Sequence, residues 1–447
     1  MADLKVSQEN DLGLAGIDGS VEYRVVKAGS TYKQNYEDLL TWIGNNVTPT
    51  TPTLQEVLDT NHDLTNGKVY IGTDAGAGTS GSNFIAIGTG AGYTNGGINV
   101  TAIGYYAGAS GEATDGLIAI GYNAGNSVYA GSNDCIAIGN GSLANARAFQ
   151  GIAVGQGAMG NALDFNQYSI GIGVNALVFN AGDYNFGMGF SAGEHSTGNH
   201  SITIGDNSGT YNEGDYNIFI GADSGQSATQ GYNVGIGYQT LKSNEGTNVN
   251  AIGQFAGYYN LGNDCFFAGR YAGFDIESFN LPNTGSSVIG IGYQSAGANS
   301  QSNVIALGDN AGYYNLGTEV VGIGLGALQQ NGGNYNIGIG TNTLATCVEP
   351  NNIGIGYLAG IYSQGANCVY LGANAGDSNT GDFVVAIGNS AGQSSQVDNA
   401  FIVSNQVLPR FQDKATADTY YAGQTLATGS TYLYIDQTDD IVKAYRN

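Results

Sequence analysis

Residues 352–360 read NIGIGYLAG, and this mixture of isoleucine, glycine and alanine returns along most of the chain. Gly354, Gly356 and Ala359 fit the G-x-G-x-x-G/A pattern by which a strand-to-helix turn binds a dinucleotide. The same spacing occurs again at 171–176, 187–192 and 322–327. A dinucleotide-binding domain carries this pattern once, so its repetition indicates that the glycines have another cause.

That cause is a short sequence repeat. Aligning the chain on the dipeptide IG and its variants gives one marker glycine per repeat, and sixteen of the twenty steps between markers are 16 residues long. The markers stand at 72, 88, 104, 121, 139, 155, 173, 189, 205, 221, 237, 253, 269, 292, 308, 324, 340, 356, 372 and 388, and Ser404 closes the series. A βαβ unit needs about 30 residues, so a repeat of this length excludes a nucleotide-binding turn.

Each repeat contains one clear strand pattern. Large apolar residues stand one and three positions before the marker, as Ile353 and Ile355 do before Gly356, with a small residue such as Gly354 between them. This alternation predicts a strand with one face in an apolar core. We expect the isoleucines to point into that core and the Ala or Gly face to be approached closely by another backbone or subunit. Four larger residues depart from the small-residue rule: Tyr70, Phe219, Phe267 and Tyr370.

The residues after the marker are typical of turns. Ala-Gly pairs follow within four residues, and Asn, Gly and Tyr are frequent further on, where Gly and Asn suit positive φ angles. We therefore predict an all-β fold, a parallel β-solenoid or β-roll of about 20 rungs, with two short strands and two turns per coil. Stacked at about 4.8 Å per rung, the coils would form a rod on the order of 100 Å long.

Composition narrows the function. The chain has 447 residues, 74 of them Gly, and a formal net charge of −24, which speaks against binding to nucleic acid. It has no window of 18 consecutive apolar residues and no N-terminal signal pattern, so we expect no membrane insertion. The four cysteines form no C-x-x-C pair, and we expect buried free thiols with no metal site and no cofactor.

Three regions are predicted. Residues 1–70 form an attachment and nucleation module with short helices at YEDLLTWI and TPTLQEVLD, residues 71–404 form the rod, and residues 405–447 form a hairpin that serves as cap or tip.

The candidate receptor contacts lie in the largest insertion and in the C-terminal hairpin: Asp275, Glu277, Phe279, Tyr432 and Tyr434. Asp275 and Glu277 also raise the possibility of glycoside hydrolysis, but two carboxylates in one loop are weak evidence for it. We predict no catalytic residue and no enzymatic activity.

The repeat resembles a known family. The segments NFIAIGTGAG, DCIAIGNGS and NVIALGDNAG are similar to the SVAIG-type repeats in the head domains of trimeric autotransporter adhesins, which are left-handed parallel β-rolls associated as trimers. Those heads repeat at a shorter period, and the secretion signal, coiled-coil stalk and membrane barrel of an autotransporter are not found in this sequence. The combination of an N-terminal module and a repetitive rod looks instead like a bacteriophage tail fibre or spike.

The resemblance carries expectations about partners. It implies a homotrimer, side by side or intertwined, with the Ala/Gly face as its interface. It also implies a location in the virion, attachment to tail or baseplate proteins through the N-terminal segment, and contact with a host-surface glycan or protein. The alternatives are a fibre of a contractile injection system, a tailspike that depolymerises polysaccharide, and a bacterial surface adhesin.

Overall fold

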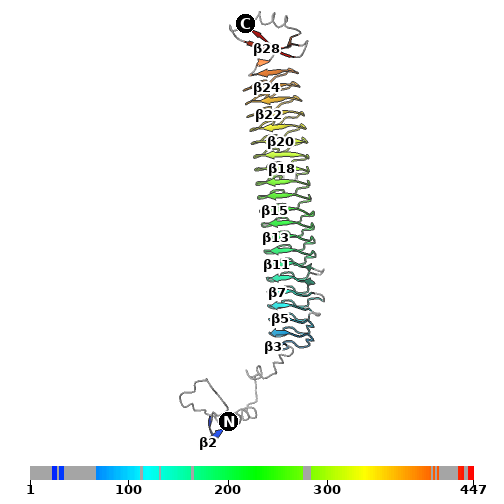
Figure 1. Cartoon of the computed structure of the whole chain (residues 1–447), viewed down its shortest axis with the longest axis vertical. Helices are drawn as coiled ribbons and strands as arrows, with labels where there is room; N and C mark the ends of the chain where they lie inside the picture. Colours follow the sequence, from blue (N-terminus) through cyan, green and yellow to red (C-terminus); the bar gives the residue numbers. More distant parts are fainter. Residues whose placement is uncertain are drawn as a thin grey trace. The chain divides into compact units, whose positions relative to one another are not determined.

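The computed structural model describes residues 67–110, 114–129, 132–162, 166–274 and 283–403, together with the backbone of strands at 23–27, 30–34, 406–407, 410–411, 431–436 and 441–446. The chain divides into two compact units, 1–65 and 66–447. The second unit contains the repeats, and the strands that precede the marker residues follow one another in chain order along a single stack (Figure 1).

The stack is a parallel sheet in which each rung adds one strand. Neighbouring strands pair in register, so that Ile337, Ile353 and Val369 lie side by side on β21, β22 and β23. The strands of the sheet are β3 (Lys68–Ile71), β4 (Phe84–Ile87), β5 (Val100–Ile103), β6 (Ile118–Ile120), β7 (Ile136–Ile138), β9 (Ile152–Val154), β11 (Ile170–Ile172), β12 (Phe186–Met188), β13 (Ile202–Ile204), β14 (Ile218–Ile220), β15 (Val234–Ile236), β16 (Asn250–Ile252), β17 (Phe266–Ala268), β18 (Val288–Ile291), β19 (Val304–Leu307), β20 (Val320–Ile323), β21 (Ile337–Ile339), β22 (Ile353–Ile355), β23 (Val369–Leu371), β24 (Val385–Ile387) and β25 (Phe401–Val403).

The predicted fold class is confirmed, but the number of strands per coil is smaller than expected. Most rungs contain a single strand, and the rest of each coil consists of turns held by backbone hydrogen bonds to the neighbouring rung. Among the described residues of the coils, β8 (Ala148–Phe149) and β10 (Asn166–Gln167) alone add a second, parallel pair. The second half of each repeat bends too often to form a strand.

The turns explain the Gly and Asn content. In the rung of Gly205, the second, fourth and sixth residues after the marker all have positive φ: Asn207 (54°), Gly209 (63°) and Tyr211 (59°). The marker glycines themselves have φ near 130°, and a Cβ on Gly356 would lie 2.7 Å from the carbonyl carbon of Gly372 on the next rung. Marker glycine is therefore required both by backbone conformation and by the close approach of the next coil.

The orientation predicted for the strand side chains was wrong. The small residue between the two isoleucines points into the coil, where Ala86, Ala119 and Ala306 are fully buried, whereas none of the isoleucines that flank it is buried. Gly354 accordingly faces the core, and Ile353 and Ile355 face outward. The Ala/Gly face is thus the lining of the solenoid and is not available as a trimer interface. The coil is too narrow to accommodate two large side chains from every strand.

Two positions of each rung share one space in the narrow interior. The residue two before the marker and the residue four after it contact each other, and one is large only where the other is small. Phe219, Phe267 and Tyr370 at the first position are accompanied by Gly225, Gly273 and Gly376 at the second. Leu241, Leu328 and Leu344 at the second position are accompanied by Gly235, Gly322 and Gly338 at the first. The four exceptions to the small-residue rule are therefore compensated within their own rungs, although Tyr70 in the first rung is 39% exposed.

A ladder of buried asparagines runs along the opposite side of the core. Each amide nitrogen donates to the amide oxygen of the preceding rung, as Asn315 does to Asn299 (3.0 Å) and Asn299 does to Asn283 (3.0 Å). These asparagines stand seven residues after the marker, except Asn283, which follows the insertion. The ladder continues through Asn244, Asn260, Asn283, Asn299, Asn315 and Asn331. It passes the longest insertion without a break, because Asn283 donates to Asn260 across 23 residues. The extra residues of that insertion leave the stacking register unchanged.

The ends carry further strands. β1 (Tyr23–Lys27) and β2 (Ser30–Gln34) form an antiparallel pair in the first unit. After β25, β26 (Gln406–Val407) pairs antiparallel with it. The hairpin expected around QTDD is present as β28 (Thr431–Asp436) and β29 (Ile441–Arg446), and β27 (Arg410–Phe411) pairs with β28. The two predicted N-terminal helices lie outside the described residues.

Candidate interaction surface

The predicted contact residues are not brought together by the described structure. Asp275, Glu277 and Phe279 lie outside the described residues, in the insertion between Phe274 and Asn283. Tyr432 and Tyr434 lie on β28, of which the backbone alone is described. Their role in receptor contact therefore remains a prediction.

The most distinctive surface is one that the sequence interpretation placed inside the molecule. We define the isoleucine face as the residues one and three positions before each marker, on strands β3 to β25. All of them are Ile, Val, Leu, Phe or Met except Thr101, Asn250 and Ala268, and none is charged. Their exposure reaches 47% at Ile252, 42% at Ile355 and 40% at Met188.

The backbone of this face offers no polar groups to a ligand. The strands that carry it are bonded to both neighbours through the parallel ladder, as β14 is to β13 and β15. Its side chains are almost entirely hydrocarbon. A surface of this kind binds other apolar surfaces and cannot recognise a sugar by hydrogen bonds.

Aromatic columns stand at the positive-φ corners of the coils. Five residues before successive markers, the rings of Tyr168, Tyr184, His200, Tyr216 and Tyr232 stack on one another at 4.7–5.1 Å. Their faces are covered by their neighbours, so that mainly ring edges and polar ring atoms meet solvent. The stack ends at Tyr232, which is 61% exposed. Among these five rings, Tyr232 is the best placed to stack on a bound molecule.

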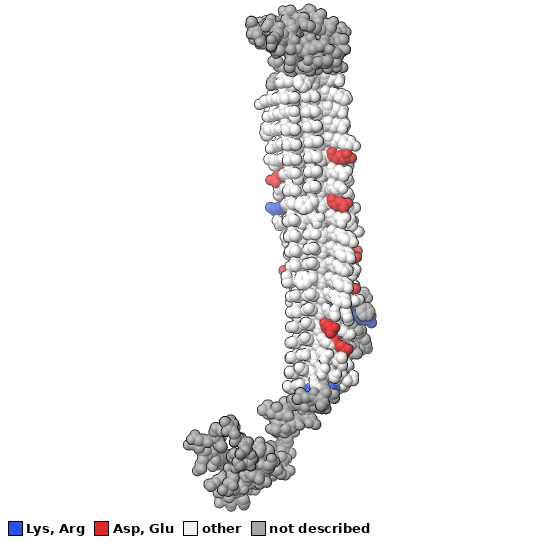
Figure 2. All heavy atoms as spheres, viewed as in Figure 1, with Lys and Arg blue, Asp and Glu red and all other residues white. Residues whose placement is uncertain are grey.

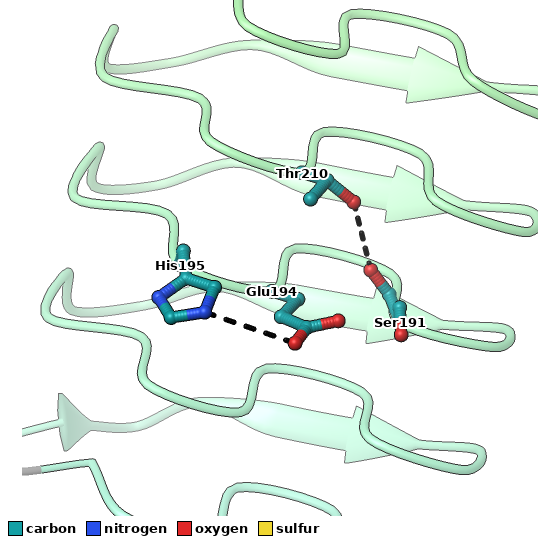
Figure 3. A network of polar contacts seen from close by, with 4 residues as sticks. All are labelled: Ser191, Glu194, His195 and Thr210. Atoms are coloured by element: carbon teal, nitrogen blue, oxygen red, sulfur yellow. Dashed lines mark hydrogen bonds and ion pairs between the residues drawn. The ribbon is translucent and has the colours of Figure 1, made fainter.

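A second, shorter column lies six residues after the markers. The ring of His195 is stacked between those of Phe179 (4.7 Å) and Tyr211 (5.0 Å). Figure 3 shows its Nε2 atom directed toward Oε1 of Glu194 at 3.8 Å, and the hydroxyl of Thr210 donating to the carbonyl oxygen of Ser191 (3.0 Å). The ring stacking and the Thr210–Ser191 bond join one rung to the next, whereas His195 and Glu194 are neighbours within the same rung.

Several acidic residues have a structural role. Six residues before the marker, a carboxylate oxygen accepts the backbone N–H at the same position of the preceding rung. Asp215 accepts from Asn199 (2.7 Å), and Asp382 accepts from Ala366 (2.8 Å). Asparagine takes this role in other rungs, as Asn334 does for Thr318. Charged side chains are sparse on the side of the solenoid drawn in Figure 2.

The cysteines are free and buried, as predicted. Burial raises the pKa of the Cys135, Cys265 and Cys347 thiols to about 11, and it also raises the pKa of Cys368. Thiols of this kind are poor nucleophiles near neutral pH. Across the described ranges, no three His, Cys, Asp or Glu residues come together in a way that could hold a metal ion.

Tyr370 is the largest fully buried side chain, and its hydroxyl is satisfied inside the core. It lies 2.7 Å from the Ser363 hydroxyl and accepts from the Asn379 amide (2.9 Å). Burial raises the pKa of this phenol strongly. Tyr370 is therefore a structural residue and takes no part in surface chemistry.

Comparison of the chain with family models, curated proteins and solved structures yields no match. In the part of the chain that the structure describes, no helical segment has the length and hydropathy of a membrane span.

Proposed function

We propose that this chain is a structural fibre protein of a bacteriophage particle, attached through its N-terminal segment, whose rod and C-terminal region contact a host-cell surface. The observation that supports this best is the unbroken stack from β3 to β25. About twenty parallel strands at about 4.8 Å per step give a reach on the order of 100 Å from a small cross-section.

The interior of the rod suits a mechanical role. Neighbouring rungs are bonded to each other through their strands and turns, and from Asn244 to Asn331 also through the buried asparagines. Stability in such a stack is the sum of similar contacts between neighbours. A binding region at one end is thereby held away from the attachment point at the other.

The surface chemistry favours contact over catalysis. In the described rungs, carboxylates such as Asp215 and Asp382 bind backbone N–H groups of the preceding rung. A polysaccharide hydrolase needs two carboxyl groups held on opposite sides of a glycosidic bond. We accordingly propose a binding protein that recognises a glycan or protein through exposed corner residues such as Tyr232 and through the terminal region.

The proposal is tested by locating the protein. Antibodies raised against the purified chain should label, by immunogold electron microscopy, the tails of particles purified from the cells that encode it, and labelling should disappear when the antibody is pre-absorbed with the protein. Label on the cell envelope alone would refute the virion location and favour a surface adhesin. Release of new reducing ends from host polysaccharide by the purified chain would refute the non-enzymatic role.

A further inference from the structure

The isoleucine face is too large and too apolar to remain in water. With roughly a third of each side chain accessible, it exposes on the order of 2,000 Å² of apolar surface, against the few hundred Å² of the largest patch on an ordinary monomer. A stable interface buries roughly 800 Å² on each partner. The face therefore provides more apolar surface than a stable interface requires.

We propose that the isoleucine face is covered by other copies of this chain, aligned parallel and in register. A partner must present a matching apolar surface along about twenty rungs with the same spacing between rungs. A second copy supplies that surface by its own fold. The large negative charge of the chain does not oppose the contact locally, because no position of the face is charged.

The polar interruptions favour the parallel arrangement. Asn250 is exposed and lies between Val234 and Phe266 on the adjoining strands, and the other polar residue of its column is Thr101 on β5. Buried against an apolar partner, its amide would lose its hydrogen bonds to water. In a parallel, in-register assembly Asn250 meets Asn250 of the other copies, and the amides bond to each other. A single asparagine in an apolar interface fixes register in the same way in coiled coils.

This inference replaces the Ala/Gly interface that the sequence suggested, and it does not depend on where the fibre is mounted or what it binds.

Cysteine crosslinking tests the face and its direction. The four native thiols are buried, so an introduced cysteine on the face is the single exposed thiol of the chain. We expect Ile339→Cys, near the C-terminal end of the face, to form a disulfide-linked dimer on mild oxidation. The matched control Ser300→Cys, at an exposed turn outside the face, should give no such band, and neither should the unmodified protein.

An antiparallel arrangement would give a different pattern of crosslinks. Ile138 and Ile339 stand at similar distances from opposite ends of the stack, so they would meet in an antiparallel pair. A crosslink that forms only when Ile138→Cys and Ile339→Cys chains are co-expressed would overturn the parallel arrangement. Crosslinking of Ile339→Cys alone supports it.

Sedimentation tests whether the face is covered at all. We expect the intact chain to sediment at a multiple of its monomer mass, and the double variant Ile236→Glu/Ile252→Glu to shift to the monomer while its far-UV circular dichroism is retained. Leu316→Glu places the same charge on a 59% exposed residue outside the face and should leave the mass unchanged. A native chain that is monomeric at micromolar concentration, or a double variant that keeps the native mass, would overturn the proposal.

Discussion

Replacing Gly225 with alanine places a methyl group where the ring of Phe219 already lies. The added Cβ would overlap Cγ, Cδ2 and Cε2 of that ring, and Phe219 is fully buried in the core. The new residue must also adopt a φ of 63°. The left-handed conformation costs about 1–2 kcal/mol for an L-residue, and overpacking of a core costs about 1–3 kcal/mol. We therefore expect Gly225→Ala to lower the free energy of unfolding by about 2–5 kcal/mol.

Gly141 is the matched control. Its φ is 65°, and a Cβ there would meet nothing within 4 Å. Gly141→Ala should show the conformational cost alone, about 1–2 kcal/mol. The difference in unfolding free energy between the two variants is the cost of the overlap with Phe219.

The assay is urea unfolding followed by circular dichroism at one fixed protein concentration, since self-association would make apparent stability depend on concentration. Adding Phe219→Ala completes a double-mutant cycle. Phe219→Ala alone should cost about 3–5 kcal/mol because it leaves a cavity, and the double variant should be less destabilised than the sum by about 1–3 kcal/mol. Equal losses for Gly225→Ala and Gly141→Ala, or strict additivity in the cycle, would refute the idea that the two core positions share one space.

The remaining predictions concern the ladder, the thiols and the buried phenol. Asn299→Ala breaks two ladder bonds and the bond to the Gln301 carbonyl, so it should cost about 2–4 kcal/mol in the same unfolding assay. The exposed Asn334→Ala should cost less than about 1 kcal/mol. Equal losses of unfolding free energy in the two variants would contradict a role for the ladder in stability. Burial raises the pKa of Cys135, Cys265 and Cys347 from 9.0 to about 11, so the unfolded chain releases these protons first and stability should fall as pH rises from about 9 to about 11. A variant with all three replaced by alanine should lose this part of the pH dependence, and an unchanged profile would assign it to other groups. In native protein at pH 8 a thiol reagent should label none of the four cysteines, and after unfolding it should label all four. Tyr370→Phe removes one hydrogen-bond partner of Ser363 and one of Asn379, and it should cost about 1–3 kcal/mol. An unchanged unfolding midpoint would show that water replaces the phenol.

The receptor contacts could not be assigned from the sequence in the way the fold could. Asp275, Glu277 and Phe279 belong to an insertion that interrupts the repeat, and such an insertion has no periodic neighbours from which its conformation could be predicted. The buried asparagine ladder, in contrast, could have been predicted from the positions of its asparagines in the repeat. Asn244, Asn260, Asn299, Asn315 and Asn331 all stand seven residues after a marker, and an amide repeated at one phase can bond to itself between rungs.

The sequence by itself determined the period, the parallel stacking and the glycine-dependent turns. A repeat of 16 residues is too short for any other parallel connection, and a glycine at the same phase of each repeat requires the same backbone turn each time. It also predicted the free thiols, because no cysteines form a C-x-x-C pair, and Cys135, Cys265 and Cys368 stand at one phase of the repeat many rungs apart.

Only the tertiary structure decided which side of the strand is inside. Alternation of Ile with Ala or Gly shows that two faces differ, and general experience places the larger apolar side chains in the core. In this coil the turns close so tightly that the interior accepts one large residue per rung at the paired positions, as Phe219 beside Gly225 or Leu241 beside Gly235. The isoleucines must therefore point outward, and a sequence pattern that looked like a core became the largest apolar surface of the protein.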